Sequence, residues 1–326
     1  MRNKGIDLVR VMGVIAVVAG HVWDTELARL LIYSWHVPIF FFFSGYFWKT
    51  GRSVTDDLRG RWQSIVRPYL FWLGVLGMLF LIAEYFRNAL SLKDFAGIVL
   101  GGSYLTRPFS AFWFVTALIV ASLLFRFFER FPAWVGVSIT GVGLLAAYMI
   151  PEVVSGIPYA AGVAIPALLF IYAGKACQQV RLSGARLVVA AFVLIGVGLL
   201  FAISGLSAPL DMKASNFGTP VVSIAVAVCI CAGLTLFGLW MEQFISAVFG
   251  RLIGELAIGG FMVVLTHAAV LYALGTQPNQ IIPDFYLALT IPWAAAVFLH
   301  RTRLSGWALG LPQRLKVPPQ SVTPER

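Results

Sequence analysis

The side chains with the clearest chemical potential in this sequence are ionisable residues inside its first hydrophobic segment, residues 5–23. Arg10 and His21 lie in that segment, where an ionisable side chain is costly and marks a functional candidate by default. Because they are eleven residues apart, a helix places them within about 20° of one face and about 16 Å apart along its axis. Asp7 lies one turn before Arg10, near the same stripe. The pattern predicts one wall of a polar tunnel, with a cation deep in the span and an imidazole near its far end.

The next hydrophobic segment, residues 30–48, carries a second histidine, His36, two residues before Pro38. A short turn at 24–29 makes the two segments antiparallel neighbours, so His36 and His21 are expected at comparable depth. Histidine titrates near neutral pH, and two of them on adjacent helices predict a proton-handling site. Pro38 lacks an N–H group and is expected to loosen the helix around it. The alternative for His36 is a packing role, with a hydrogen bond to another helix.

Two further candidates lie later in the chain. His267 falls in the apolar segment 256–274, where a histidine is either functional or hydrogen-bonded to a neighbouring helix. Trp113 and Phe114 lie near the start of the segment 109–128, at a position typical of an aromatic belt at the membrane interface. The alternative interpretation of this aromatic pair is the rim of a substrate cleft.

A strongly basic stretch, residues 49–67, separates the second and third hydrophobic segments and is predicted to be an inner loop. Its cations are Lys49, Arg52, Arg59, Arg61 and Arg67, partly offset by Asp56 and Asp57. Such a loop can set the topology or touch anionic lipid headgroups. It can also dock an anionic cytosolic ligand, because arginine forks suit phosphates. Charge alone favours the topological role.

The composition is that of a polytopic membrane protein. Of the 326 residues, 60% are hydrophobic and only 12% are charged, with a mean hydropathy of +0.87, which excludes an ordinary soluble domain. Runs of roughly 20 apolar residues cross a bilayer as helices. We therefore expect an all-α fold of about ten transmembrane helices, near residues 5–23, 30–48, 66–86, 109–128, 134–150, 157–174, 187–205, 219–240, 256–274 and 282–299.

The net charge of +10 follows the positive-inside rule. With both termini in the cytoplasm, the inner segments carry 18 Lys and Arg residues and the outer segments carry five: Arg29, Arg87, Lys93, Arg107 and Lys213. This split leaves no basic patch that calls for nucleic acid as a partner. The first segment is expected to stay in the mature protein, because no small-residue cleavage site follows it. The three cysteines form no metal-binding or redox pattern and are expected to be ordinary buried thiols.

Several of these motifs together resemble the acyltransferase-3 family of integral-membrane acyltransferases. The first motif is a basic residue, Arg10, followed after ten intervening residues by a histidine, His21. The others are His36-Val-Pro-Ile-Phe-Phe-Phe-Phe-Ser44-Gly45-Tyr46, the stretch from Arg61 to Arg67-Pro68-Tyr69, the Trp113-Phe114 pair and the late segment from Ile253-Gly254 to His267. The similarity covers most of the chain and is most specific in the first 70 residues. It is closest to compact members related to sugar O-acetyltransferases, without a fused extracytoplasmic domain.

The resemblance implies an integral-membrane acyltransferase domain over residues 1–300 and a short cytoplasmic tail over 301–326, in a bacterial inner membrane. It implies transfer of an acyl group, usually acetyl from cytosolic acetyl-CoA, to a hydroxyl of an envelope glycan or lipid-linked sugar. His21 would be the catalytic histidine, with Arg10 and Asp7 as its first-span partners. The acceptor or acyl group would be met by His36, Ser44, Trp113 and His267, and the CoA phosphates by Arg59, Arg61 and Arg67. The sequence departs from the family pattern at one position: the family often has an R-x-x-R pair in the first inner loop, but here Ser64 lies three residues after Arg61.

The chemistry fits these residue types. Transfer to an alcohol needs a base for the hydroxyl proton and a positive or donor group for the tetrahedral oxyanion. A thioester is already activated, so neither a metal nor a permanently bound cofactor is expected. Arg10, far from His21, is expected to hold the donor arm or to organise the tunnel through Asp7. The alternative is a proton-coupled transporter or flippase that uses the same intramembrane residues as a relay.

Overall fold

The computed structural model describes residues 3–89, 91–277 and 282–312, which are helical with no strand among them. The α-helices, in chain order, are α1 (Lys4–Val22), α2 (Glu26–Ile32), α3 (Pro38–Tyr46), α4 (Val54–Arg61), α5 (Arg67–Phe86), α6 (Leu92–Leu100), α7 (Phe112–Phe128), α8 (Ala133–Met149), α9 (Pro151–Ser155), α10 (Ala161–Cys177), α11 (Gly184–Ile203), α12 (Val222–Met241), α13 (Ala247–Leu274), α14 (Ile282–His300) and α15 (Ser305–Leu309). Short turns of other helix types are η1 (Trp62–Val66), η2 (Gly102–Tyr104), η3 (Pro158–Ala160), η4 (Met212–Ala214) and η5 (Glu242–Phe244).

The helices confirm an all-α polytopic membrane fold. Within the described residues, seven helices are long and apolar enough to cross a bilayer, and α7 and α8 are shorter apolar helices. Nine of the predicted hydrophobic segments coincide with single helices to within a few residues, apart from α13, which begins nine residues earlier than predicted. The number of spans and the sides of the two termini stay predictions.

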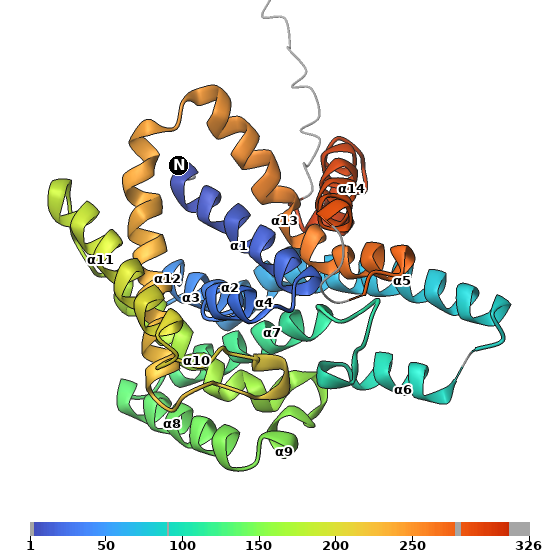
Figure 1. Ribbon diagram of the computed structural model, residues 1–326, viewed down its shortest axis with the longest axis horizontal. Coiled ribbons are helices and arrows are strands. Elements are labelled where there is room, and N and C mark those ends of the chain that lie inside the picture. Colours follow the sequence, from blue (N-terminus) through green and yellow to red (C-terminus); the bar gives the residue numbers. More distant parts are fainter. Residues whose placement is uncertain (1–2, 90, 278–281, 313–326) are drawn as a thin grey trace, which may run out of the picture.

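The first helix, α1, lies at the centre of the bundle. It packs against α12, α13 and α14, and Figure 1 shows it enclosed between α12 and α13. In its most apolar window 72% of the residues are buried, against 17% for α11, which lies outside α12. Asn3 caps α1, because its side chain accepts a hydrogen bond from the Ile6 N–H at 2.8 Å. The helix with the most ionisable candidates is therefore the one best shielded from lipid.

The predicted second span, 30–48, is not one helix but two, α2 and α3, joined by a turn. Pro38 begins α3, where a missing N–H costs nothing. Three consecutive side chains donate hydrogen bonds to backbone carbonyls at the end of α2. Ser34 Oγ donates to Leu30 O at 2.7 Å, Trp35 Nε1 to Leu31 O at 2.9 Å, and His36 Nδ1 to Ile32 O at 2.9 Å. These bonds satisfy backbone groups that a break inside a membrane would otherwise leave bare.

The basic stretch 49–67 is not a loop throughout, as was predicted, because most of it is helical and continuous with α5. Ser53 caps α4 by accepting a hydrogen bond from the Asp56 N–H at 3.1 Å, and it also donates to the Asp56 carboxylate at 2.7 Å. A π-turn, η1, precedes Arg67 and Pro68. Because Pro68 cannot donate a hydrogen bond, the helix continues through this wider turn. The basic residues are thus held on a rigid element.

Two glycines allow α3 and α10 to cross in close contact. A Cβ atom added to Gly45 would lie 1.9 Å from Ile171 O, and one added to Gly174 would lie 1.9 Å from Phe42 O. Small residues at such crossings let helix backbones approach in membranes. The crossing fixes α3, and with it Ser44 and the start of the basic stretch, against the rest of the bundle.

We expect Gly174→Ala to destabilise the protein by about 1–3 kcal/mol or more, because the added methyl group meets a backbone carbonyl that cannot move aside. The matched control is Gly196→Ala in α11, where an added Cβ meets nothing within 4 Å. Thermal unfolding of the detergent-purified variants is the measurement. Equal melting temperatures for the two variants would show that the crossing is not close-packed.

Candidate functional site

The structure brings His21 and His267 together at one end of the bundle. His21 lies near the end of α1 and His267 on α13, and their ring centroids are 4.9 Å apart. His21 is half-buried, whereas His267 is fully buried. The two helices pack along much of their length, so the pair is held by the central contact of the fold. The sequence offered these two histidines as separate candidates, and the fold makes them one site.

The hydrogen bond of His267 fixes its tautomer. Its Nδ1 lies 3.0 Å from Val263 O, and a carbonyl can only accept, so Nδ1 carries the proton. The other ring nitrogen, Nε2, is buried and has no hydrogen-bond partner among the described residues. His36 is held in the same tautomer by its bond to Ile32 O. Each ring therefore presents an Nε2 lone pair, which can accept a proton.

His36 lies at the same end of the bundle, linked to α1 through Tyr33. The Tyr33 ring stacks on His36 with centroids 4.8 Å apart, and its hydroxyl donates to Gly20 O at 3.1 Å. Gly20 directly precedes His21 in the chain. The predicted grouping of the first-span and second-span histidines therefore agrees with the structure, although their rings are not in direct contact.

Two cations that the charge pattern predicted only as topology determinants, Arg107 and Lys213, lie at this end of the bundle. Arg107 donates to His21 O at 2.8 Å and to Thr276 O at 2.6 Å, which ties the end of α1 to the end of α13. Lys213, in η4, donates to Leu105 O at 2.5 Å. Burial lowers the pKa of both Arg107 and Lys213. In the sequence, the one feature that could have marked these two residues as site candidates is that they are among the five cations predicted for the outer side.

A cavity of about 520 Å³ leads from the basic stretch toward the histidine pair. Its polar mouth is lined by Lys49, Arg52, Arg61 and Arg126, and its apolar part includes Val14, Phe114 and Val264. Val14 is two turns below His21 on α1, and Val264 is one turn below His267 on α13. The cavity therefore ends beneath both histidines, between the helices that carry them.

Arg10 and Ser44 line this cavity, as a tunnel residue should. Arg10 is paired with the buried Asp7 at 3.2 Å, and its guanidinium lies over the Phe47 ring at 4.7 Å from the centroid. Ser44 is 3.3 Å from the Ser122 hydroxyl. Of the polar wall predicted on α1, Arg10 lines the cavity and is held by Asp7, whereas His21 does not line it.

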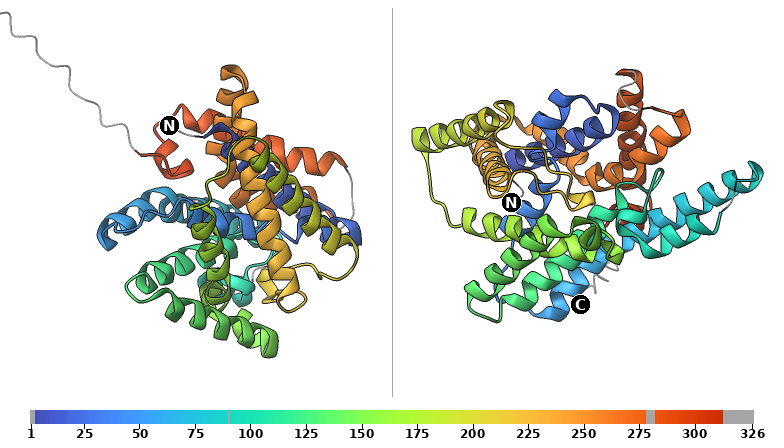
Figure 2. Two further views of the ribbon diagram at one scale, coloured as in Figure 1. Left: turned by 90° about the vertical axis from the view of Figure 1, so that its left-hand side faces the viewer. Right: turned by 60° about the horizontal axis from the view of Figure 1, so that its bottom comes forward.

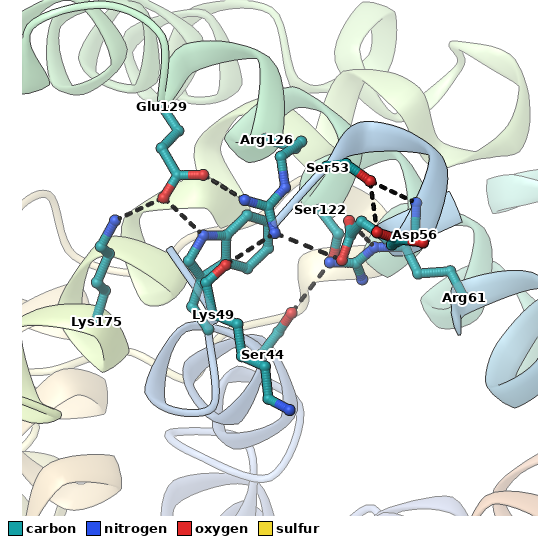
Figure 3. A network of polar contacts seen from close by, with 11 residues as sticks. Ser44, Lys49, Ser53, Asp56, Arg61, Ser122, Arg126, Glu129 and Lys175 are labelled. Atoms are coloured by element: carbon teal, nitrogen blue, oxygen red, sulfur yellow. Dashed lines mark hydrogen bonds and ion pairs between the residues drawn. The ribbon is translucent and has the colours of Figure 1, made fainter. Parts of the chain in front are cut away.

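A network of polar contacts braces the mouth of the cavity (Figure 3). Arg126 bonds Glu129 and Lys49 O, lies 3.5 Å from the Asp57 carboxylate, and stacks on the Trp48 ring at 4.1 Å. Asp57 also accepts from Arg61 at 2.8 Å. The network joins α4, α7 and the end of α3, so it holds the cations of the mouth in place.

Glu129 is the anionic centre of this network. It accepts hydrogen bonds from Lys175 Nζ at 3.1 Å and from Trp48 Nε1 at 3.0 Å. Burial raises the pKa of its carboxyl, but these bonds and the charges of Lys175 and Arg126 outweigh burial and lower it overall. Glu129 therefore stays ionised and offsets part of the positive charge at the mouth.

Of the ten predicted site residues, three line the cavity, namely Arg10, Ser44 and Arg61. Apart from Asp7, which pairs with Arg10, three others belong neither to its lining nor to the histidine group. Arg59 is exposed on α4 and does not line it. Arg67 is buried, donates to Leu311 O at 2.8 Å and lies over the Trp307 ring, so it fastens the predicted tail to α5. Trp113 is packed in the core beside Phe114. The predicted tail itself begins with α15, which packs against α5, while residues 313–326 lie outside the described part of the chain.

The described residues contain no group of three His, Cys, Asp or Glu side chains that could hold a metal ion. Cys177 and Cys231 are buried and Cys229 is half-buried.

Comparison with known families and proteins gives one match. The family model described as an acyltransferase domain, acyltransferase-3, matches residues 3–299. Searches of curated proteins and of solved structures gave no significant match. The match covers the helices that carry the histidine pair, the cavity and the network, and it favours acyl transfer over the transporter alternative. The chain belongs to the acyltransferase-3 family and is a membrane acyltransferase.

Proposed function

We propose that the protein is an O-acetyltransferase that moves an acetyl group from cytosolic acetyl-CoA to a hydroxyl of an envelope glycan in a bacterial inner membrane. The main support for this proposal is the cavity, which has a basic mouth and extends between α1 and α13 toward the paired histidines. A donor with phosphates at one end and a thioester at the other matches both the charge and the shape of that path.

The mouth of the cavity supplies the nucleotide end of the donor site. Lys49, Arg52 and Arg61 can pair with the phosphates of CoA, and arginine forks bind phosphate oxygens in a defined geometry. Of the three arginines predicted to contact the CoA phosphates, only Arg61 lines the cavity. Arg52 also lines it, and we assign it the phosphate contact that was predicted for Arg59 and Arg67. Arg10 lines the same cavity from α1, where the polar amides of the pantetheine arm can pass.

The histidine end supplies the base. One ring nitrogen of His21 takes the proton of the acceptor hydroxyl as the oxygen attacks the thioester carbon. The bare Nε2 of His267 can accept the other N–H of His21, which holds His21 in the tautomer that a base requires. The tetrahedral oxyanion would form near Arg107, whose guanidinium lies at the His21 carbonyl and whose positive charge stabilises it. Collapse breaks the carbon–sulfur bond, and the CoA thiolate leaves and takes up the proton from His21.

The test compares the envelope glycans of cells with and without the gene by mass spectrometry. We expect glycan species heavier by one acetyl group in the cells that make the protein, and none in cells that make the His21→Ala variant at the same level. Identical glycan spectra in all three strains would contradict an envelope-glycan acceptor. A mass difference of another acyl group would contradict acetyl as the donor.

A further inference from the structure

Ser110 carries a buried hydroxyl group that has no hydrogen-bond partner within the described part of the chain. The residue is only 9% exposed, and the hydroxyl is the one polar group of its side chain. Burying a polar group without a partner costs free energy, so buried hydroxyls in native proteins are paired unless a function or a bound molecule uses them. The hydroxyl of Ser110 is therefore available to donate to a substrate.

Ser110 extends a series of residues, four positions apart along α7, that borders the donor cavity. Phe114, Leu118 and Arg126 belong to this series and line the cavity. Arg126 lies at the basic mouth, and Phe114 lies in the apolar part. Four residues make about one helical turn, so Ser110 lies about one turn beyond Phe114, on the side away from the mouth.

The cavity ends in the same way on two neighbouring helices, α1 and α13, which pack against each other through the bundle (Figures 1 and 2). On α13, Val264 lines the cavity, and His267 with its unpaired Nε2 follows three residues later. On α1, Val14 lines the cavity two turns before His21. Polar residues of three elements therefore lie just past the apolar end of the cavity.

Arg107 connects Ser110 to the histidine end of the bundle. It lies three residues before Ser110 and donates to His21 O at 2.8 Å. The chain turns tightly between the two residues, since the Phe109 N–H donates to Thr106 O at 2.7 Å. The same short turn thus carries an arginine that contacts the α1 end of the site and a serine whose hydroxyl is unpaired.

We propose that Ser110 is a further catalytic residue, whose hydroxyl donates a hydrogen bond to the thioester carbonyl oxygen and to the tetrahedral oxyanion formed from it. This role rests on the proposed function, in which an acceptor hydroxyl attacks the thioester carbon. As the new carbon–oxygen bond forms, the π electrons of the carbonyl move onto its oxygen, which then accepts a stronger hydrogen bond from Ser110. Ser110 keeps its proton throughout. When the carbonyl forms again, the carbon–sulfur bond breaks and the CoA thiolate leaves.

The test is Ser110→Ala, which removes the proposed donor from a buried position. We expect release of CoA from acetyl-CoA to slow by about 10²–10³-fold, measured with the full-length protein in detergent and envelope extract from the producing cells. The affinity for CoA, measured by calorimetric titration, should equal that of the wild type, because the phosphates bind at the mouth of the cavity. The melting temperature should stay the same or rise, because the variant no longer buries an unpaired hydroxyl.

Ser215→Ala is the matched control. Ser215 is also buried, and its hydroxyl also lacks a partner among the described residues, but it lies at the end of η4 and does not line the cavity. This variant should keep the wild-type rate. Equal rates for Ser110→Ala and the wild type, or an equal loss of rate in the two serine variants, would overturn the proposal.

Two further outcomes have a definite meaning. An acetyl group found on Ser110 by mass spectrometry, after exposure of the protein to acetyl-CoA, would overturn the proposal, because the serine would then be a nucleophile. A wild type that releases no CoA in the presence of envelope extract would contradict the proposed function, whereas an active wild type with an equally active Ser110→Ala would contradict only the role of Ser110. Should Ser110→Ala fail to fold, Ser110→Cys gives the same test, because a thiol is a weak donor.

Discussion

His21→Ala is expected to lower the rate of acyl transfer by about 10²–10⁴-fold, the usual contribution of a general base. The affinity for acyl-CoA should stay near that of the wild type, because the phosphates bind at the opposite end of the cavity. His21 makes no side-chain hydrogen bond that the described structure records, so thermal stability should change little. The measurement is release of CoA from acetyl-CoA by the purified protein with its acceptor, together with a melting curve.

The companion variant is His267→Gln, which tests the positioning role of His267. We expect a loss of turnover at unchanged donor affinity, and an altered pH profile, because His21 would no longer be held in one tautomer. A purely structural role would lower thermal stability but leave the pH profile as it was. If His21→Ala kept more than about a tenth of the wild-type rate, a general-base role for His21 would be contradicted.

The second large effect concerns the mouth of the donor cavity. Replacing Arg52 and Arg61 together with Gln removes two cations that line it, and a hydrogen bond to a charged group is worth about 1.5–3 kcal/mol. Since about 1.4 kcal/mol is tenfold in affinity, the double variant should bind CoA about 100-fold more weakly or worse. Calorimetric titration with CoA measures this directly.

The matched control for this variant is Arg59→Gln, which removes a cation from the same helix but outside the cavity. Its CoA affinity should equal that of the wild type. Equal weakening by Arg59→Gln would show that the basic stretch acts through its overall charge. Unchanged affinity in the folded double variant would show that the donor enters elsewhere or is not CoA.

The membrane fold could be predicted from hydropathy because apolar runs of bilayer length leave few alternatives. The break at Pro38 was harder to place, since it depends on side-chain bonds from Ser34, Trp35 and His36 to the preceding carbonyls. Helix α4 was missed because its charges resemble those of a solvated loop, although Ser53 and Asp56 form a helix-capping pair that was readable in the sequence.

The site could be predicted only in part, for a related reason. Helical periodicity aligned Arg10 with His21, but in the structure only Arg10 lines the cavity, while His21 lies beyond its end beside His267. Nothing in local spacing pairs His21 with His267, because that contact joins opposite ends of the chain. Arg107 and Arg67 show the same limit: charge alone cannot distinguish an arginine that ties the site to its neighbours from one that fastens a terminal helix.

We expect the donor and the acceptor to reach the histidine pair from opposite sides of the membrane. Proteoliposomes carrying the protein, with acetyl-labelled acetyl-CoA on one side only and envelope extract from the producing cells on the other, test it directly. A Thr55→Cys variant, read with an impermeant maleimide, identifies the side that carries the basic stretch. We predict labelled acceptor only when acetyl-CoA is on the side where position 55 reacts, and none with His21→Ala. Equal labelling with the donor on the opposite side, or labelling that survives His21→Ala, would contradict the account.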